Sequence, residues 1–321
     1  YAEAYAHYIF IAAPFMICSF IMNNLLRFQG KASFAMVGIT VGGLLNIALD
    51  PLFIFTLDMG TAGAALATGL SQFISFCILL WMCNHQDSCI SISIRKFRPK
   101  LAIYREVLYG GIPSLGRQGI ASVATILMNF MCQPYGDAAI AAMSIVSRFM
   151  FFINSVIIGF GQGFQPVCSY CFGAGLYDRV KKACWFCIRV STIILLVLSV
   201  ISFPAARSII TLFRRNDPTV IEIGTLALRL QLITLPLQGA VIMGNMMPQS
   251  IGYGFRATLV STARQGIFLI PLLTIMTYTI GLLGIQCAQP LADIATFILS
   301  LFVIRGIFKE FPEDASSFAA Q

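Results

Sequence analysis

Residues 7–26 read HYIFIAAPFMICSFIMNNLL, twenty residues without a Lys, Arg, Asp or Glu. A run of about 20 apolar residues is long enough to cross a hydrocarbon core of about 30 Å as an α-helix. The whole chain has the same character, because 58% of its 321 residues are hydrophobic and only 11% are charged, against about 25% charged residues in an ordinary soluble domain. The sequence therefore predicts an all-α, polytopic membrane protein with the lipid bilayer as its surroundings.

Further apolar runs follow, separated by short polar connections. They predict nine transmembrane helices, at residues 7–26, 33–57, 61–84, 106–132, 138–165, 184–212, 219–249, 256–279 and 282–305. The first of these begins almost at Tyr1, and no signal-peptide signature precedes it. We therefore interpret the chain as truncated at its N-terminus.

Basic residues gather in alternate connections between these spans. Cytoplasmic loops retain Lys and Arg, so the alternation sets the orientation and predicts a cytoplasmic C-terminus. It also accounts for the net charge of +8 without a nucleic-acid partner. Arg207, Arg214 and Arg215 depart from the pattern, since they fall on the outer side. The basic connections contain Arg27 and Lys31; Arg95, Lys96, Arg98, Lys100 and Arg105; Arg179, Lys181 and Lys182; Arg256; and Arg305 and Lys309.

Features of the first three spans recur in the last three at an offset of about 220 residues. Such duplication is typical of transporters and predicts a parallel repeat of two six-helix lobes, with nine of twelve expected helices present. Residues 1–84 would then be the last three helices of the N-terminal lobe, 85–105 a basic cytoplasmic linker, 106–306 the C-terminal lobe and 307–321 a cytoplasmic tail. The matched positions are Pro14 and Pro236, Gln29 and Gln249, Pro51 and Pro271, Gly60 and Gly281, and Gly63 and Gly284.

Several motifs together resemble those of the multidrug and toxic compound extrusion (MATE) transporters, in particular the bacterial multidrug-type branch. They are Arg27-Phe-Gln-Gly30, Asn46-Ile-Ala-Leu-Asp50-Pro51, Gly60-Thr-Ala-Gly63, Gly159-Phe-Gly161-Gln162-Gly163-Phe-Gln165-Pro166 and Asp178-Arg179-Val180-Lys181-Lys182-Ala183. The resemblance implies two lobes around a central cavity in the bacterial inner membrane. It also implies a secondary exporter of cationic or amphipathic organic compounds, working by cation-coupled antiport and alternating access. We expect a monomer that is not an enzyme and whose partners are small-molecule substrates and lipid.

The chain departs from the family pattern in span 106–132. That span has no carboxylate between Gly111 and Met131, and it reads Arg117-Gln118 where a Na⁺-coupled relative would offer an acid. The family's usual coupling acid in the N-terminal lobe would lie upstream of this chain. We therefore expect no cofactor, and H⁺ rather than Na⁺ as the coupling ion.

Ionisable side chains inside spans are functional candidates, because each costs at least about 2.5–3.5 kcal/mol at mid-depth. Asp293 is a coupling or gating candidate that can pair with Arg264, a second such candidate. Asp50 precedes Pro51, which disfavours helix at Asp50, so Asp50 is either a gate residue or a helix-ending residue with an interhelical hydrogen bond. Arg148 is a substrate-cavity candidate that we expect to face the bundle.

Two groups of uncharged residues complete the candidate site. Gly161, Gly163 and Pro166 are gating candidates, and Gln162 and Gln165 beside them can bond a solute; the alternative is tight helix packing. Gln231, Gln238 and Asn245 recur every seven residues, so they share a helix face. That polar stripe predicts a cavity wall, with interhelical hydrogen bonding as the alternative. Met243 can supply an adaptable apolar wall.

A zinc site, a flippase and an intramembrane enzyme are the alternatives. The pairs Cys168/Cys171 and Cys184/Cys187 have a zinc-like spacing, but they lie in apolar segments and we predict no metal site. A flippase for lipid-linked saccharides would use Arg117, Arg148 and Arg264 to hold pyrophosphate. An intramembrane enzyme would need a cluster of acids or a histidine pair, and the two histidines, His7 and His85, lie near no acid cluster.

Overall fold

The computed structural model describes residues 2–85, 100–214 and 217–311, and every regular element in these ranges is helical. The all-α prediction is confirmed. The chain divides into two compact units, Tyr1–Pro99 and Lys100–Gln321. Residues 86–99 of the predicted linker and 312–321 of the predicted tail lie outside the described residues.

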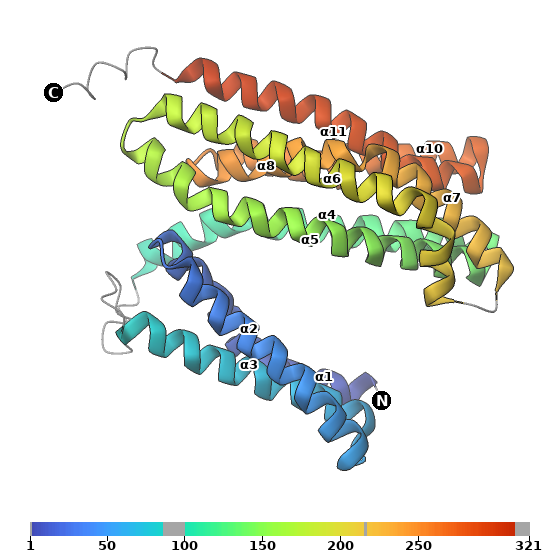
Figure 1. The fold of residues 1–321 in the computed structure, drawn as a ribbon, viewed down its shortest axis with the longest axis horizontal. Coiled ribbons are helices and arrows are strands. Elements are labelled where there is room, and N and C mark those ends of the chain that lie inside the picture. The colour runs from blue at the N-terminus through green and yellow to red at the C-terminus, as the bar shows by residue number, and fades with distance from the viewer. Residues whose placement is uncertain (1, 86–99, 215–216, 312–321) are drawn as a thin grey trace. The chain divides into compact units, whose positions relative to one another are not determined.

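The first unit contains three long helices, α1 (Ala2–Phe28), α2 (Ala32–Pro51) and α3 (Gly60–His85), and a π-helix, η1 (Leu52–Thr56), that extends α2 (Figure 1). Met22, Leu26 and Leu79 are buried at its core. A Cβ atom added to Gly38 would lie 2.4 Å from Leu79 Cδ2, so glycine is what lets α2 approach α3. Small residues at such contacts are typical of helices that pack in lipid.

The second unit contains, in its described residues, the long helix α4 and five segments that are long and apolar enough to span a membrane, two of which are interrupted. Figure 1 shows α5 and α6 as long helices joined by a turn at one end, with α11 along the same unit. The core of this unit is apolar and includes Val146, Leu195, Leu232 and Ile304. The elements are α4 (Leu101–Cys132), η3 (Gln133–Tyr135), α5 (Asp137–Gly173), α6 (Tyr177–Phe213), α7 (Pro218–Thr234), η4 (Leu235–Leu237), α8 (Gln238–Ser250), α9 (Gly254–Thr262), η5 (Ala263–Leu269), α10 (Ile270–Ile280) and α11 (Leu282–Glu310).

The two interruptions have different geometries. Pro236 lies in η4, a 3₁₀ turn between α7 and α8, where its missing N–H and its ring disturb the α-helical hydrogen bonds. The π-helix η5 lies between α9 and α10 and contains Arg264. Segments of π-helix inside α-helices are rare overall, and those that occur are often found at functional sites. Both spans therefore change their backbone geometry midway.

Eight helical segments in the described ranges are long and apolar enough to cross a membrane. They correspond to eight of the nine predicted spans. The remaining prediction, 106–132, lies within α4, which is not among the eight, so its passage through the bilayer stays a prediction. The eight segments are Ala6–Phe28, Ala32–Thr56, Gly60–Asn84, Asp137–Gly173, Tyr177–Phe213, Pro218–Ser250, Gly254–Ile280 and Leu282–Glu310.

The internal repeat appears in the backbone of the turns. Gly30 and Gly252, which follow matched spans, have φ angles of 79° and 88°. Gly60 and Gly281, in the next matched turn, have φ angles of 54° and 68°. Positive φ strains any residue with a side chain, so glycine is required at both positions of each turn. The same turn geometry, kept at the same offset, supports the duplication predicted from the sequence.

Candidate functional site

The most polar point inside the second unit joins η5 to α11. Arg264 Nε lies 2.9 Å from Asp293 Oδ1. Gln289, one turn before Asp293, donates from Nε2 to the same oxygen at 3.1 Å. Asp293 is 2% exposed, whereas a quarter of the Arg264 side chain is accessible. The pairing predicted for these two charges is confirmed. The Asp293 carboxylate neutralises the Arg264 cation within a span, and protonation of Asp293 would leave that cation without a counter-charge.

The predicted polar stripe lies inside the helical unit. Gln231 is 5% exposed and Gln238 is fully buried. Asn245 Nδ2 donates to Ala257 O at 2.6 Å and also contacts Ser261 Oγ, so it links α8 to α9. For Asn245 the interhelical alternative is thus confirmed. The stripe spans the break at η4, so its residues share the interior although they do not lie on one continuous helix.

Gln238 differs from its neighbours because neither the nitrogen nor the oxygen of its carboxamide has a hydrogen-bond partner among the described residues. A buried amide without partners is costly. Gln238→Met, which keeps the volume and removes the polar atoms, is therefore expected to stabilise the protein by about 1 kcal/mol. A thermal melt of the purified protein measures this.

The control for Gln238 is Asn245→Leu, because Asn245 belongs to the same stripe but makes its hydrogen bonds. Its loss is expected to destabilise by about 1–2 kcal/mol, since it leaves Ala257 O without this donor. If both variants melt at lower temperatures than the parent, the Gln238 amide is satisfied in the membrane and our interpretation is wrong.

The glycine-rich run of α5 packs against α8 at one position. A Cβ atom added to Gly161 would lie 2.3 Å from Met246 Sδ, whereas nothing lies within 4 Å of the same atom at Gly163. The helix continues through Pro166 to Gly173 without a break. Gln162 is half-buried, and Gln165 Nε2 lies 3.4 Å from Gln249 Oε1. The packing alternative holds for Gly161, and the gating roles of Gly163 and Pro166 stay predictions.

Three predicted placements need correction. Arg148 is exposed on α5 rather than buried inside the bundle. Met243 is fully buried and lies beside Gly161, so it belongs to the core and not to an exposed wall. Pro51 does not end the helix after Asp50, because α2 includes Pro51 and continues into the π-helix η1. A switch to π-type hydrogen bonding lets the helix continue past Pro51, which has no backbone N–H to donate.

Asp50 takes part in a hydrogen-bonded group within the first unit. Asn46 Nδ2 lies 3.2 Å from Asp50 Oδ1 and 3.4 Å from Thr68 Oγ1. This group connects α2 to α3 through Thr68. The interhelical hydrogen bond predicted for Asp50 is made instead by Asn46, because Asp50 bonds, among the described residues, only within α2.

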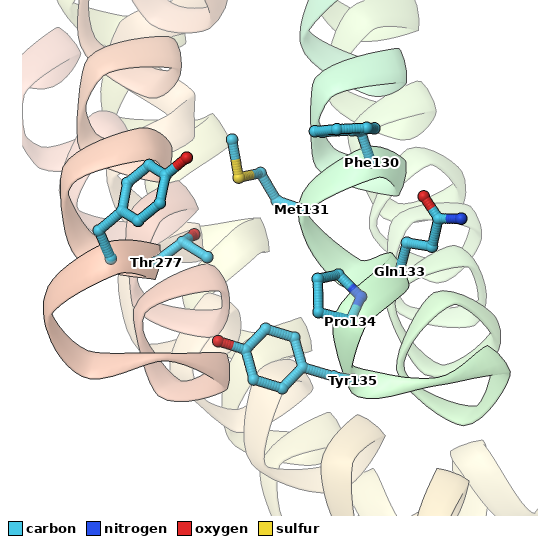
Figure 2. A pocket seen from close by; sticks show the side chains of 7 residues that line it. Phe130, Met131, Gln133, Pro134, Tyr135 and Thr277 are labelled. Atoms are coloured by element: carbon cyan, nitrogen blue, oxygen red, sulfur yellow. The ribbon is translucent and has the colours of Figure 1, made fainter.

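Two hollows open on the second unit, and no predicted site residue lines either of them. Figure 2 shows the first, of about 410 Å³, with Tyr135 reaching from the α4–α5 connection toward α10. Its lining is aromatic and uncharged, and includes Phe130 and Tyr278. The second, of about 760 Å³, contains charged residues and lies between α6, α7 and α11.

The four cysteines with zinc-like spacing, Cys168, Cys171, Cys184 and Cys187, are buried in the apolar core of the second unit. No group of three or more potential metal ligands occurs in the part of the chain that the structure describes. Their small, apolar side chains fill space between α5 and α6.

The long apolar helices of this chain can be compared with known protein families. The sequence pattern of the MatE family matches residues 113–282, more than half of the chain. The chain belongs to the MatE family. It is a multi-pass membrane protein of a bacterial transporter family.

Relatives of this MatE chain align along nearly all of it. The multidrug export protein MepA of Staphylococcus haemolyticus is 27% identical over 317 residues, which cover 99% of this chain and 70% of the relative. MepA of Staphylococcus saprophyticus is 28% identical over 304 residues, which cover 95% of this chain and 67% of the relative. An outward-facing multidrug resistance MATE transporter has the same fold, with a TM-score of 0.90 and 24% identity. The match covers 97% of this chain and 70% of that transporter.

Some polar contacts of this MatE chain were not predicted from the sequence. Gln289 precedes Asp293 by four residues, a spacing that places two side chains on one helix face, so its contact was readable from the sequence. Ser300 donates to Ala240 O at 3.0 Å, and Gln286 donates to Ile223 O at 3.1 Å. These contacts join segments about 60 residues apart, and no local pattern indicates them. The side chain of Arg117 lies outside the described part of the structure.

Proposed function

We propose that this chain works as a secondary active exporter of cationic or amphipathic organic compounds, by cation-coupled antiport and alternating access. The observation that carries the proposal is the alignment of almost the whole chain with proteins named as multidrug exporters. We place it in the bacterial inner membrane as a monomer with its C-terminus in the cytoplasm, and we assign it no enzymatic activity and no cofactor.

The paired charges of the second unit support a cationic substrate. The Arg264–Asp293 contact removes the repulsion that an unpaired Arg264 would exert on organic cations. Asp293 is also the acid within the described part of this unit that is buried in a span, which makes it the proton-coupling candidate. We propose H⁺ rather than Na⁺, because its neighbours are a guanidinium and an amide, neither of which offers an oxygen shell that a Na⁺ ion would need.

The test is dye transport driven by an imposed gradient. The gene that encodes this chain is expressed in bacteria that lack their own exporters, and inside-out vesicles are loaded with a pH gradient, acid inside. We expect ethidium to accumulate several-fold above vesicles without the protein, and the accumulation to collapse when an ionophore dissipates the pH gradient.

A Na⁺ gradient of equal size is the matched control and is expected to drive no uptake. Uptake that follows Na⁺ alone would reject the proton assignment but keep the exporter. No movement of any cationic dye under either gradient would reject the exporter, and the flippase would then be tested with a fluorescent lipid-linked pyrophosphate.

A further inference from the structure

The larger hollow of the second unit, of about 760 Å³, is lined by residues from the end of α6 and from the starts of α7 and α11. Its volume is within the range of about 300–1,000 Å³ that is common for ligand sites. The hollow is separate from the Arg264–Asp293 pair and from the buried amide stripe, because none of those residues lines it. The function proposed above does not use it.

Three charged side chains line this pocket. Arg207 comes from α6, and Glu222 and Arg229 come from α7. Glu222 and Arg229 are seven residues apart, so they lie on one face of α7. Within the described ranges, no ion pair of 4.0 Å or less involves any of the three. The pocket therefore presents two guanidinium groups and one carboxylate that are available to a ligand.

The arginine from α7 is held in position by an aromatic ring. The guanidinium of Arg229 lies 5.5 Å from the centre of the Phe203 ring, on α6. Such a contact leaves the edges of the guanidinium, where its N–H groups point, free to donate hydrogen bonds. Arg229 can thus bind an anionic group while its face stays against Phe203.

A buried amide supplies the pocket with an acceptor. Gln286 lines the pocket from α11 and is 2% exposed. Its Nε2 donates to Ile223 O at 3.1 Å, while Oε1 has no hydrogen-bond partner in the described part of the chain. Buried polar atoms without partners are rare in native proteins. A ligand with an N–H donor would supply the missing bond after a small rotation of the amide.

The polar residues of the pocket lie toward the ends of their helices. At about 1.5 Å per residue, Glu222 is about 6 Å and Arg229 about 16 Å from Pro218, where α7 begins. The long arginine side chain can extend toward the interface. Leu226 and Leu283 also line the pocket and are 42% and 50% exposed. The pocket therefore combines a polar end with an apolar, exposed side, as an acyl chain requires.

We propose that this pocket is a binding site for a phospholipid whose headgroup carries both a phosphate and a primary amine. Arg207 and Arg229 bind the phosphate, as guanidinium groups commonly do. Glu222 and Gln286 Oε1 accept hydrogen bonds from the ammonium group, and the acyl chains lie against Leu226 and Leu283. An anionic lipid without an amine would leave the Glu222 carboxylate without a cationic partner. The bound lipid would connect α6, α7 and α11.

Lipid retention by the purified full chain tests this. The protein in detergent is mixed with equal amounts of phosphatidylethanolamine and phosphatidylglycerol, and native mass spectrometry counts the lipids bound. We expect preferential retention of phosphatidylethanolamine. Arg207→Gln is expected to weaken its binding about tenfold, the effect of losing one charge-assisted hydrogen bond. Arg207 is exposed, so this variant should fold.

The matched control is Arg305→Gln, which removes an exposed arginine near the other end of α11 and should leave retention unchanged. Glu222→Gln tests the amine contact separately and should abolish the preference over phosphatidylglycerol. Equal retention of both lipids by the parent protein, or equal losses in Arg207→Gln and Arg305→Gln, would overturn the proposal. So would protection from thermal unfolding by glycerophosphoethanolamine as large as that given by the lipid, because the ligand would then be a soluble phosphodiester.

Discussion

Asp293→Ala is expected to destabilise the protein by about 3 kcal/mol, because it leaves the Arg264 guanidinium inside a span without its carboxylate. The variant also removes the acceptor of the Gln289 amide. Penalties for breaking buried ion pairs run to about 3–5 kcal/mol, and the partial exposure of Arg264 places this case at the lower end. A thermal melt of the purified protein measures the loss.

The double variant Asp293→Ala/Arg264→Ala distinguishes an unpaired charge from a simple packing defect. Removing the arginine as well eliminates the uncompensated cation, so we expect the double variant to be more stable than Asp293→Ala alone. Arg305→Ala, which removes an exposed arginine from the same helix, should change stability by less than about 0.5 kcal/mol. A double variant that is less stable than either single variant would show that the pair contributes through packing and not through charge.

This pair was predictable from the sequence because the energetics of lipid constrain it. A charge inside a span must find a partner, and few acids lie inside the spans of this chain, so Asp293 and Arg264 were readily matched. The spans themselves were predictable for a similar reason, since helix length and hydropathy are local properties. The turn glycines Gly60 and Gly281 were likewise evident, because glycine adopts positive φ angles without steric cost.

Burial was harder to predict than residue spacing. The seven-residue spacing predicted one helix face for Gln231, Gln238 and Asn245, but the 3₁₀ turn η4 interrupts that helix, and spacing does not say which helix covers the face. In the structure α5, α6 and α11 pack around α8, so Gln238 and Met243 are enclosed. Arg148 is exposed for the complementary reason, since its face of α5 is turned away from the core. The pocket beside Gln286 combines the end of α6 and the start of α7 with the start of α11, which is distant in the sequence, and no motif indicates it.

Close helix contact at Gly284 gives the second large effect. A Cβ atom added there would lie 2.1 Å from Met276 O, a backbone atom that cannot rotate away as a side chain would. Gly284→Ala must therefore separate α11 from α10, and we expect a destabilisation of about 3 kcal/mol, at the upper end of typical overpacking costs.

Gly306→Ala on the same helix is the control, because nothing lies within 4 Å of its added Cβ. Alanine's higher helix propensity should leave that variant unchanged or stabilise it by up to about 1 kcal/mol. Equal melting temperatures for the two variants would mean that α10 and α11 pack less closely in the membrane than this geometry requires. A selective loss at Gly284 would instead show that this position of the predicted repeat is held by contact between helix backbones, as at Gly63, where the added atom would lie 2.7 Å from Phe53 O.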